Sequence, residues 1–226
     1  MKSGVIGKIT GKLKEIESYG KTREEGDFEL KRQLEFRTKL PGPGDSAANS
    51  GRAAIERVEE TERVQFRDNE ILVSDSKEKV QLHTNFLLVP DSFMIVESGR
   101  GEFAFNLVEG LGNIEIERAR IDLLALLEYC SEFDPDPWQV GFFGNEGNAE
   151  KGVVYGEEIL TDSKIGEMLR TSKMNQIGLR FTDHEGTNIK FTATKSGYVQ
   201  IYQPQSYDEI DLMRFVDKFI LPNLLD

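Results

Sequence analysis

Three short segments between Ile177 and Tyr202 alternate apolar and polar residues, and this alternation restricts that part of the chain to β-strands. The segments run over residues 177–182, 187–194 and 198–202. Because successive side chains of a strand point to opposite faces, the alternation predicts one apolar face and one polar face. The apolar face comprises Ile177, Leu179, Phe181, Ile189, Phe191, Ala193, Val199 and Ile201.

The polar face of these segments contains no carboxylate, although 40 of the 226 residues are acidic. Two cations and two aromatic rings stand on it among hydroxyl and amide groups. Its members are Arg180, Thr182, Lys190, Thr192, Thr194, Tyr198, Gln200 and Tyr202. This composition predicts a ligand-binding surface. The plainer interpretation is that Thr and Tyr are favoured in strands whatever their role.

The overall charge limits which ligands such a surface meets. A net charge of −12 repels nucleic acids and anionic membranes, so any nucleic-acid role requires a local patch that acts against the global field. A hydrophobic content of 38%, with 14 phenylalanines, is enough for a folded core.

Cysteine content and hydropathy indicate the compartment. The single cysteine, Cys130, excludes an internal disulfide framework and is compatible with a reducing environment. The first residues lack the apolar core of a secretory signal, and no apolar run approaches the roughly 20 residues that span a bilayer. We therefore expect a cytoplasmic protein without membrane contact.

The first half of the chain is predicted to be a β-rich domain over residues 1–110. We expect an antiparallel ribbon within residues 1–40 and a flexible loop, rich in Pro, Gly, Ser and Asn, at 41–54. Short strands follow, the first two joined by a turn at Arg67–Asn69. They are expected at 63–66, 70–73, 80–89, 92–97 and 102–108.

The second half, residues 111–226, is predicted to be an α+β domain. It begins with a strand at 113–121 and a helix at 122–133 with Asp122 as N-cap, followed by a strand at 138–143 and a glycine-rich loop at 144–152. A short helix over 157–172, the three alternating strands and a last helix over 208–225 complete it. The predicted fold class is thus α+β: an antiparallel β-rich N-terminal region followed by a curved antiparallel sheet backed by helices.

Motifs of catalysis and of cofactor binding are missing from the sequence. Neither Gly144–Gly152 nor Gly99–Gly101 has the spacing of a dinucleotide or phosphate loop, and two distant histidines offer no metal cluster, so we expect no cofactor. Cys130 falls on the apolar stripe of its helix and is interpreted as a core residue, and His184 as part of a hairpin turn. A hydrolase built from scattered carboxylates remains an alternative, because 40 acidic residues always offer pairs somewhere.

From Asn113 to Leu225 the order of elements resembles half of the saddle of TATA-box-binding proteins. The segment Phe191-Thr-Ala-Thr-Lys-Ser-Gly-Tyr-Val-Gln-Ile201 is similar to the strand-turn-strand region of that family, and Asp134–Pro137 stands where the family has a proline-containing loop. The resemblance implies a sheet that presents polar, cationic and aromatic groups to DNA. The chain departs from the family in the insertion 144–172, in lacking a second copy of the unit and in having no assured counterpart of the wedging phenylalanines, although Phe142 and Phe143 lie next to the sheet.

The sequence therefore predicts a non-enzymatic binding protein that uses the polar face of the C-terminal sheet, with nucleic acid as the named ligand. One alternative is a protein-interaction or assembly module, in which an exposed strand pairs with a protein partner or with a second copy of the chain. The other alternative is the carboxylate hydrolase.

Overall fold

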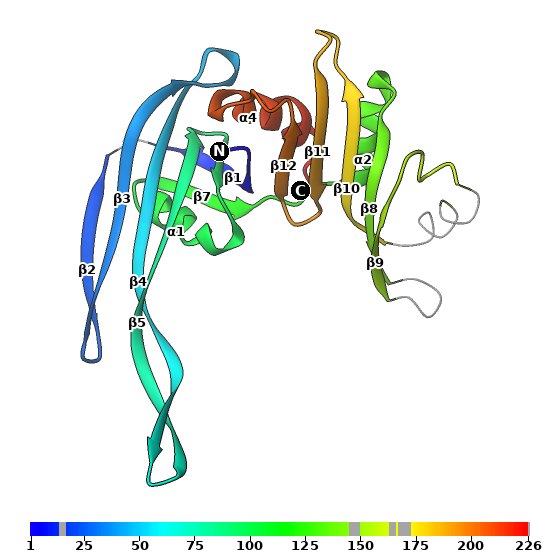
Figure 1. Cartoon of the computed structure of the whole chain (residues 1–226). Helices are drawn as coiled ribbons and strands as arrows, with labels where there is room; N and C mark the ends of the chain where they lie inside the picture. Colours follow the sequence, from blue (N-terminus) through cyan, green and yellow to red (C-terminus); the bar gives the residue numbers. More distant parts are fainter. Residues whose placement is uncertain (14–16, 145–149, 163–165, 167–172, 226) are drawn as a thin grey trace.

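The computed structural model describes residues 1–13, 17–144, 150–162, 166 and 173–225. Within them the chain forms one sheet of twelve strands, mostly antiparallel, with a few short helices, so the fold is α+β with strands dominant (Figure 1). The strands are β1 (Ser3–Lys12), β2 (Tyr19–Glu25), β3 (Phe28–Pro41), β4 (Ala47–Arg67), β5 (Glu70–Val89), β6 (Phe93–Val96), β7 (Asn113–Arg118), β8 (Asp136–Phe143), β9 (Lys151–Tyr155), β10 (Lys173–Thr182), β11 (Asn188–Thr194) and β12 (Tyr198–Gln203). Across the sheet their order is β2-β3-β4-β5-β6-β1-β12-β11-β10-β8-β9, and β7 pairs with β1.

Strand β1 joins the two parts of the sheet. Its residues Val5–Lys8 pair with β6, while Ser3–Val5 pair with β12 and Gly7–Lys12 pair with β7. The boundary expected near residue 110 falls between the helix that precedes β7 and β7 itself. The division into two domains stays a prediction, although one sheet crosses that boundary.

Helices cover opposite faces of the sheet in its two parts. Helix α1 (Phe103–Glu109) lies over β1 and its neighbours, in a core that includes Phe86, Met94 and Phe105. The opposite face packs against α2 (Leu123–Tyr129) and α4 (Glu209–Phe215). The helical turns are η1 (Pro43–Asp45), η2 (Gly99–Gly101), η3 (Cys130–Phe133), η4 (Val216–Ile220) and η5 (Leu221–Asn223).

Strands β4 and β5 continue beyond the sheet as a two-stranded arm, residues 56–81. The last residue of β4 that pairs with β3 is Ile55, whereas β4 and β5 pair with each other as far as Arg67 and Glu70. At the turn, Asp68 and Asn69 both have positive φ, as a tight turn matched to the twist of two antiparallel strands requires. The arm projects well away from the body (Figure 1).

Several predictions for the first half are wrong in type or extent. The strand expected at 102–108 is wrong, because these residues after Glu102 belong to helix α1, in which Ala104, Phe105, Leu107 and Val108 are buried with helical spacing. The expected loop at 41–54 is mostly strand, since β4 begins at Ala47 and Asn49 is already buried. The ribbon expected within residues 1–40 consists of β2 and β3 only, whereas β1 pairs elsewhere.

In the second half, most predicted elements are confirmed. Strand β7, helix α2 with Asp122 capping Leu124 N and Ala125 N, strand β8 and the three alternating strands lie close to the expected ranges. The last helix begins with a capping box of Asp208 and Asp211. The helix expected at 157–172 and the loop at 144–152 lie largely outside the described residues. Where the chain is described, no helix is long and apolar enough to cross a membrane.

Gly51 allows β4 to pass directly under the ring of Phe86. A Cβ at this position would lie 2.3 Å from the Glu35 carbonyl oxygen and 2.3 Å from Phe86 Cζ. We expect Gly51→Ala to lower the free energy of unfolding by about 1–3 kcal/mol through overpacking, as measured by urea denaturation. The control Gly20→Ala, whose Cβ would approach no atom closer than the Arg32 carbonyl oxygen at 3.9 Å, should change it by less than about 0.5 kcal/mol. Equal effects of the two substitutions would contradict this packing.

Candidate functional site

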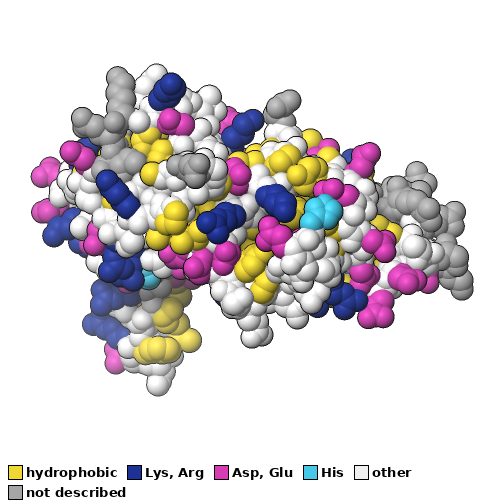
Figure 2. Space-filling model, turned by 90° about the horizontal axis from the view of Figure 1, so that it is seen from above, with side chains coloured by type: hydrophobic (Ala, Val, Ile, Leu, Met, Phe, Trp, Pro, Cys, Tyr) yellow, Lys and Arg dark blue, Asp and Glu magenta, His cyan; other side chains and the backbone are white. Residues whose placement is uncertain are grey.

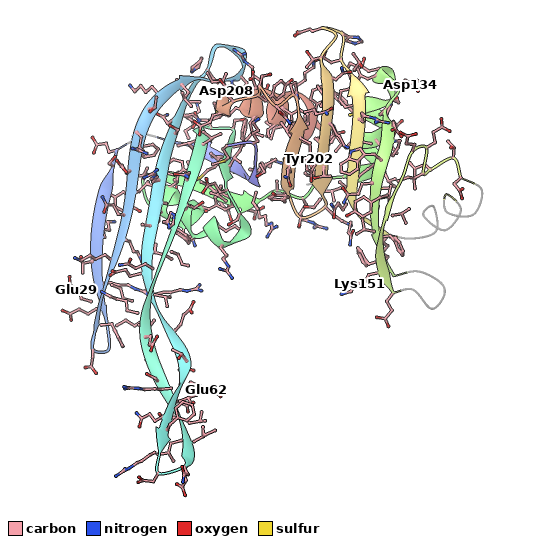
Figure 3. All side chains as sticks on the ribbon, viewed as in Figure 1. Glu29, Glu62, Asp134, Lys151, Tyr202 and Asp208 are labelled. Atoms are coloured by element: carbon pink, nitrogen blue, oxygen red, sulfur yellow. The ribbon has the colours of Figure 1, made fainter. Side chains whose placement is uncertain are left out.

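The polar side of β8, β10, β11 and β12, here called the open face, is the candidate site. Helices α2 and α4 pack on the other side of these strands, where the apolar residues predicted for the three segments are buried. The open face therefore carries its polar and aromatic groups on a rigid sheet rather than on loops. In Figure 3 the labelled Tyr202 lies on β12 within this part of the sheet.

The register of the strands brings the central candidates together. Arg180 of β10 stands opposite Lys190 of β11, and Thr192 of β11 stands opposite Gln200 of β12. Gly178 pairs with Thr192 on one side and with Gln139 of β8 on the other. Two rows of polar side chains thus cross neighbouring strands on one face.

Two tyrosine rings and Lys190 contact the ring of Trp138, and sequence alternation missed Trp138 and Tyr155. The Lys190 Nζ lies 4.2 Å from the centre of the Trp138 ring, a cation–π contact. Tyr202 meets Trp138 edge to face at 5.6 Å between centroids, and Tyr155 of β9 lies 6.3 Å from it. Tyr202 is 40% exposed and Tyr155 is 65% exposed. We call Trp138, Tyr155, Lys190 and Tyr202 the aromatic cluster.

Two irregularities of the sheet build this cluster. The register between β8 and β10 shifts between Gly178 and Leu179, and the indole of Trp138 lies across Gly178, where a Cβ would come within 2.8 Å of its Cε2 atom. A second shift, between Lys190 and Phe191, places Tyr202 in a bulge of the β11–β12 pair. Bulges of this kind redirect side chains, and alternation alone does not reveal them.

Arg180 is paired with carboxylates that come from outside the three segments. Its Nη2 lies 2.6 Å from Asp136 Oδ2 and 3.5 Å from Glu157 Oε1. The hydrogen bond that Arg180 donates to the Asp136 carboxylate raises the pKa of the guanidinium, so this group stays charged. The three segments themselves contribute no carboxylate to this face, but β8 and the segment after β9 bring Asp136 and Glu157 to it.

Two of the remaining predicted residues, Thr182 and Thr194, lie toward the ends of the face. Thr182 donates to Asn188 Oδ1 at 2.8 Å beside the β10–β11 turn, and the Thr194 hydroxyl accepts from Tyr198 N at 3.0 Å beside the next turn. Tyr198 is half-buried against the core under α1. Thr192 is buried in the centre. Lys190 and Tyr202 are therefore the predicted residues most available to a ligand.

Trp138 Nε1 is an unusual atom on this face. Within the described part of the chain it is the one buried side-chain nitrogen or oxygen without a hydrogen-bond partner. A buried donor left unpaired costs about 1–3 kcal/mol, so an acceptor that reached it would stabilise the site.

Other residues singled out in the sequence have structural roles. His184 lies in the β10–β11 turn, where Asp183 Oδ1 accepts from Glu185 N and Thr187 N, and the His184 ring packs on Phe133 at 4.7 Å. The described residues contain no group of three His, Cys, Asp or Glu that could hold a metal ion.

Cys130 is buried in the core against α2, as predicted, and burial raises the pKa of its thiol to about 12. We expect a thiol reagent at pH 8 to modify the native protein roughly 1,000-fold more slowly than the urea-unfolded chain, because the thiolate is the reactive form. The raised pKa also means that the contribution of the Cys130 thiol to the free energy of unfolding is lost as the pH rises from about 9 toward about 12. In that range the thiol ionises in the unfolded chain but not in the native fold. Equal rates of modification would show that the thiol is accessible in the native fold.

No family model matches this chain, and no curated protein matches it either. The geometry of the open face and of the arm is therefore the ground for a functional proposal.

Proposed function

We propose that the protein binds a nucleic acid strand on the open face of its C-terminal sheet, without catalysing a reaction. The observation that carries this proposal is the aromatic cluster: a lysine and two exposed tyrosines contact the Trp138 ring on the side of the C-terminal strands opposite α2 and α4. Sheet faces of this composition bind strands by stacking bases on rings while cations meet phosphates.

A single strand fits this face better than a duplex. Tyr155 and Tyr202 can stack only on bases that are free of their neighbours, and the indole of Trp138 lies between them. Lys190 would leave the Trp138 ring for a phosphate and uncover the indole for an acceptor of the ligand. The expected likeness to half of a TATA-box-binding saddle agrees with a binding face opposite α2 and α4, and it stays a proposal together with the ligand.

Charge is the main obstacle to this proposal, and it sharpens the test. The net charge of −12 opposes a polyanion, and Arg180 is already paired with Asp136 and Glu157. Binding therefore depends on the rings and on few phosphate contacts, so it should be weak at physiological salt and should tighten only moderately at low salt.

Trp138 is the only tryptophan of the chain, so its fluorescence reports directly on the open face. We expect single-stranded DNA or RNA of about 20 nucleotides to quench the Trp138 fluorescence at low salt, and Tyr202→Ala to weaken binding by roughly 1–3 kcal/mol. Lys190→Gln should make the affinity less dependent on salt, with a slope lower by the equivalent of about one phosphate contact.

Tyr129→Ala is the matched control for Tyr202→Ala. Tyr129 is 39% exposed, close to the 40% of Tyr202, but it lies on α2 on the opposite side of the sheet. Its substitution should leave the affinity unchanged. Unaltered binding in both Tyr202→Ala and Lys190→Gln would overturn the proposal.

A second candidate, a protein-interaction module, is favoured by the end of the arm. Val64 pairs with Val73 and Phe66 pairs with Ile71, so these four apolar side chains share one face of the hairpin. All four are exposed, and Phe66 is 81% exposed. Figure 2 shows apolar side chains at the end of the arm, whereas acidic and basic side chains intermingle over the body. An exposed apolar patch of this kind marks an interaction site.

If this apolar tip joins copies of the chain, Phe66→Ser with Ile71→Ser should abolish an assembly that light scattering detects in the native protein. Leu72→Ser is the control, because Leu72 is exposed on the other face of the same hairpin. Association through apolar groups persists in high salt, whereas nucleic-acid binding weakens there. A native protein that is monomeric at high concentration would exclude self-assembly.

The hydrolase alternative finds no support in the pockets that the described residues line. Among the described residues, the pocket beside α2 is lined by one carboxylate, Asp122, which accepts from backbone N–H groups at the start of that helix. A second pocket contains Glu56, whose pKa is lowered by hydrogen bonds from Gln81 and from Lys31 N. Neither arrangement pairs two carboxylates for acid–base catalysis.

A further inference from the structure

At the end of the open face lies a groove of about 680 Å³ in which none of the described lining residues is a carboxylate. The lining residues are Arg118, Ala119, Arg120, Phe143, Asn175, Gln176, Thr194, Lys195 and Ser196. Three cations, two amides and two hydroxyls therefore face one hollow in a protein whose net charge is −12. We call it the basic groove.

The backbone holds the cations of the basic groove in place. The segment after β7 runs beside the β11–β12 turn, with Ile121 N donating to the Lys195 carbonyl at 3.1 Å and Lys195 N donating to the Asn175 carbonyl at 2.9 Å. Gly197, at φ +81°, lets the turn approach so closely that a Cβ would lie 2.4 Å from the Ala119 carbonyl oxygen. Residues distant in the sequence thus present their side chains together by backbone contacts.

The three cations differ in how far they are already engaged. Arg118 Nη1 lies 2.7 Å from Glu102 Oε1, and its Nε donates to the Ser196 carbonyl, so Arg118 is fixed in orientation. Arg120 is exposed and Lys195 is half-buried, and neither side chain forms an ion pair with a described residue. Arg120 and Lys195 therefore remain available for an anion.

The basic groove continues the open face rather than standing apart from it. Thr194 and Gln176, which pair across β11 and β10, belong to its lining, and they lie two residues from Thr192 and Gly178 in the row beneath Trp138. Phe143, which pairs with Lys151 and Lys173, adds an exposed ring beside two further cations. Figure 3 shows Lys151 at the lower end of β9, the end of the sheet at which Figure 1 shows the β11–β12 turn.

We propose that the basic groove binds backbone phosphates of the strand whose bases stack on the aromatic cluster. This inference rests on the proposed function and extends it, because it assigns the main electrostatic contact to residues outside the cluster. Amide and hydroxyl donors beside two neighbouring cations suit phosphate oxygens, which accept several hydrogen bonds at once. Because the charge of Arg180 is already balanced by Asp136 and Glu157, the groove supplies the positive charge that the open face lacks.

The test compares two double variants with the same change in charge. Arg120→Glu with Lys195→Glu reverses the groove, and Arg63→Glu with Lys39→Glu reverses two exposed cations elsewhere. Quenching of the Trp138 fluorescence by single-stranded DNA of about 20 nucleotides is followed from low to moderate salt. We expect the groove variant to bind at least about 30-fold more weakly, with a salt slope lower by about 1.4, and the control to bind within about threefold of the native protein.

Further arms separate the sources of phosphate and the two proposals. The midpoint of thermal unfolding measured with pyrophosphate tests whether the groove binds small anions. The assignment to the nucleic-acid backbone would be overturned if pyrophosphate stabilised the native protein but not the groove variant, while both proteins bound DNA equally well. DNA binding unchanged in the groove variant but weakened by Tyr202→Ala would overturn the groove and leave the proposed function standing. DNA binding lost in the groove variant but unaffected by Tyr202→Ala would support the groove and remove the stacking face. Arg120→Gln with Lys195→Gln repeats the comparison without charge reversal, and no DNA binding by the native protein would overturn both.

Discussion

Strand β1 forms hydrogen bonds along both edges, and the rest of the structure depends on this pairing. One edge meets β6, and the other meets β12 and then β7, with Ile6 N donating to the Gly197 carbonyl and Ala119 N donating to the Ile6 carbonyl where the two partners meet. Val5 and Ile6 point into the two different cores. One strand thus fixes the β11–β12 turn, the segment after β7 and, through them, the position of the basic groove.

The distribution of helices decides which surface stays available. Helix α1 covers β1 and its neighbours on one side, whereas α2 and α4 cover the C-terminal strands on the other side. The open face is therefore on the side of α1 but beyond it. The rings and cations proposed to bind a strand are carried by strands whose backs are packed with aromatic residues such as Phe181, Phe191 and Phe215. Such a support keeps the binding groups in one arrangement.

How far the sequence predicts this structure depends on whether local patterns decide the outcome. The alternation of residues 177–202 and the cap at Asp122 predict their elements correctly, because period and capping are local properties. The strand predicted at 102–108 is wrong because Phe and Val favour strands, whereas tertiary burial selects helix α1. The contribution of Trp138 and the pairing of Asp136 with Arg180 depend on the register of β8, which no single sequence reveals. The basic groove joins residues about 75 positions apart, so spacing alone gives no sign of it.

The central place of β1 also bears on how the chain is made. Its partners lie some 90 residues away in β6, about 110 away in β7 and nearly 200 away in β12. During synthesis on the ribosome, this apolar strand waits unpaired until the later strands emerge, and contacts of such long sequence separation form slowly. In the interval it can pair with other unfinished chains, so a chaperone that shields it would raise the yield of native protein.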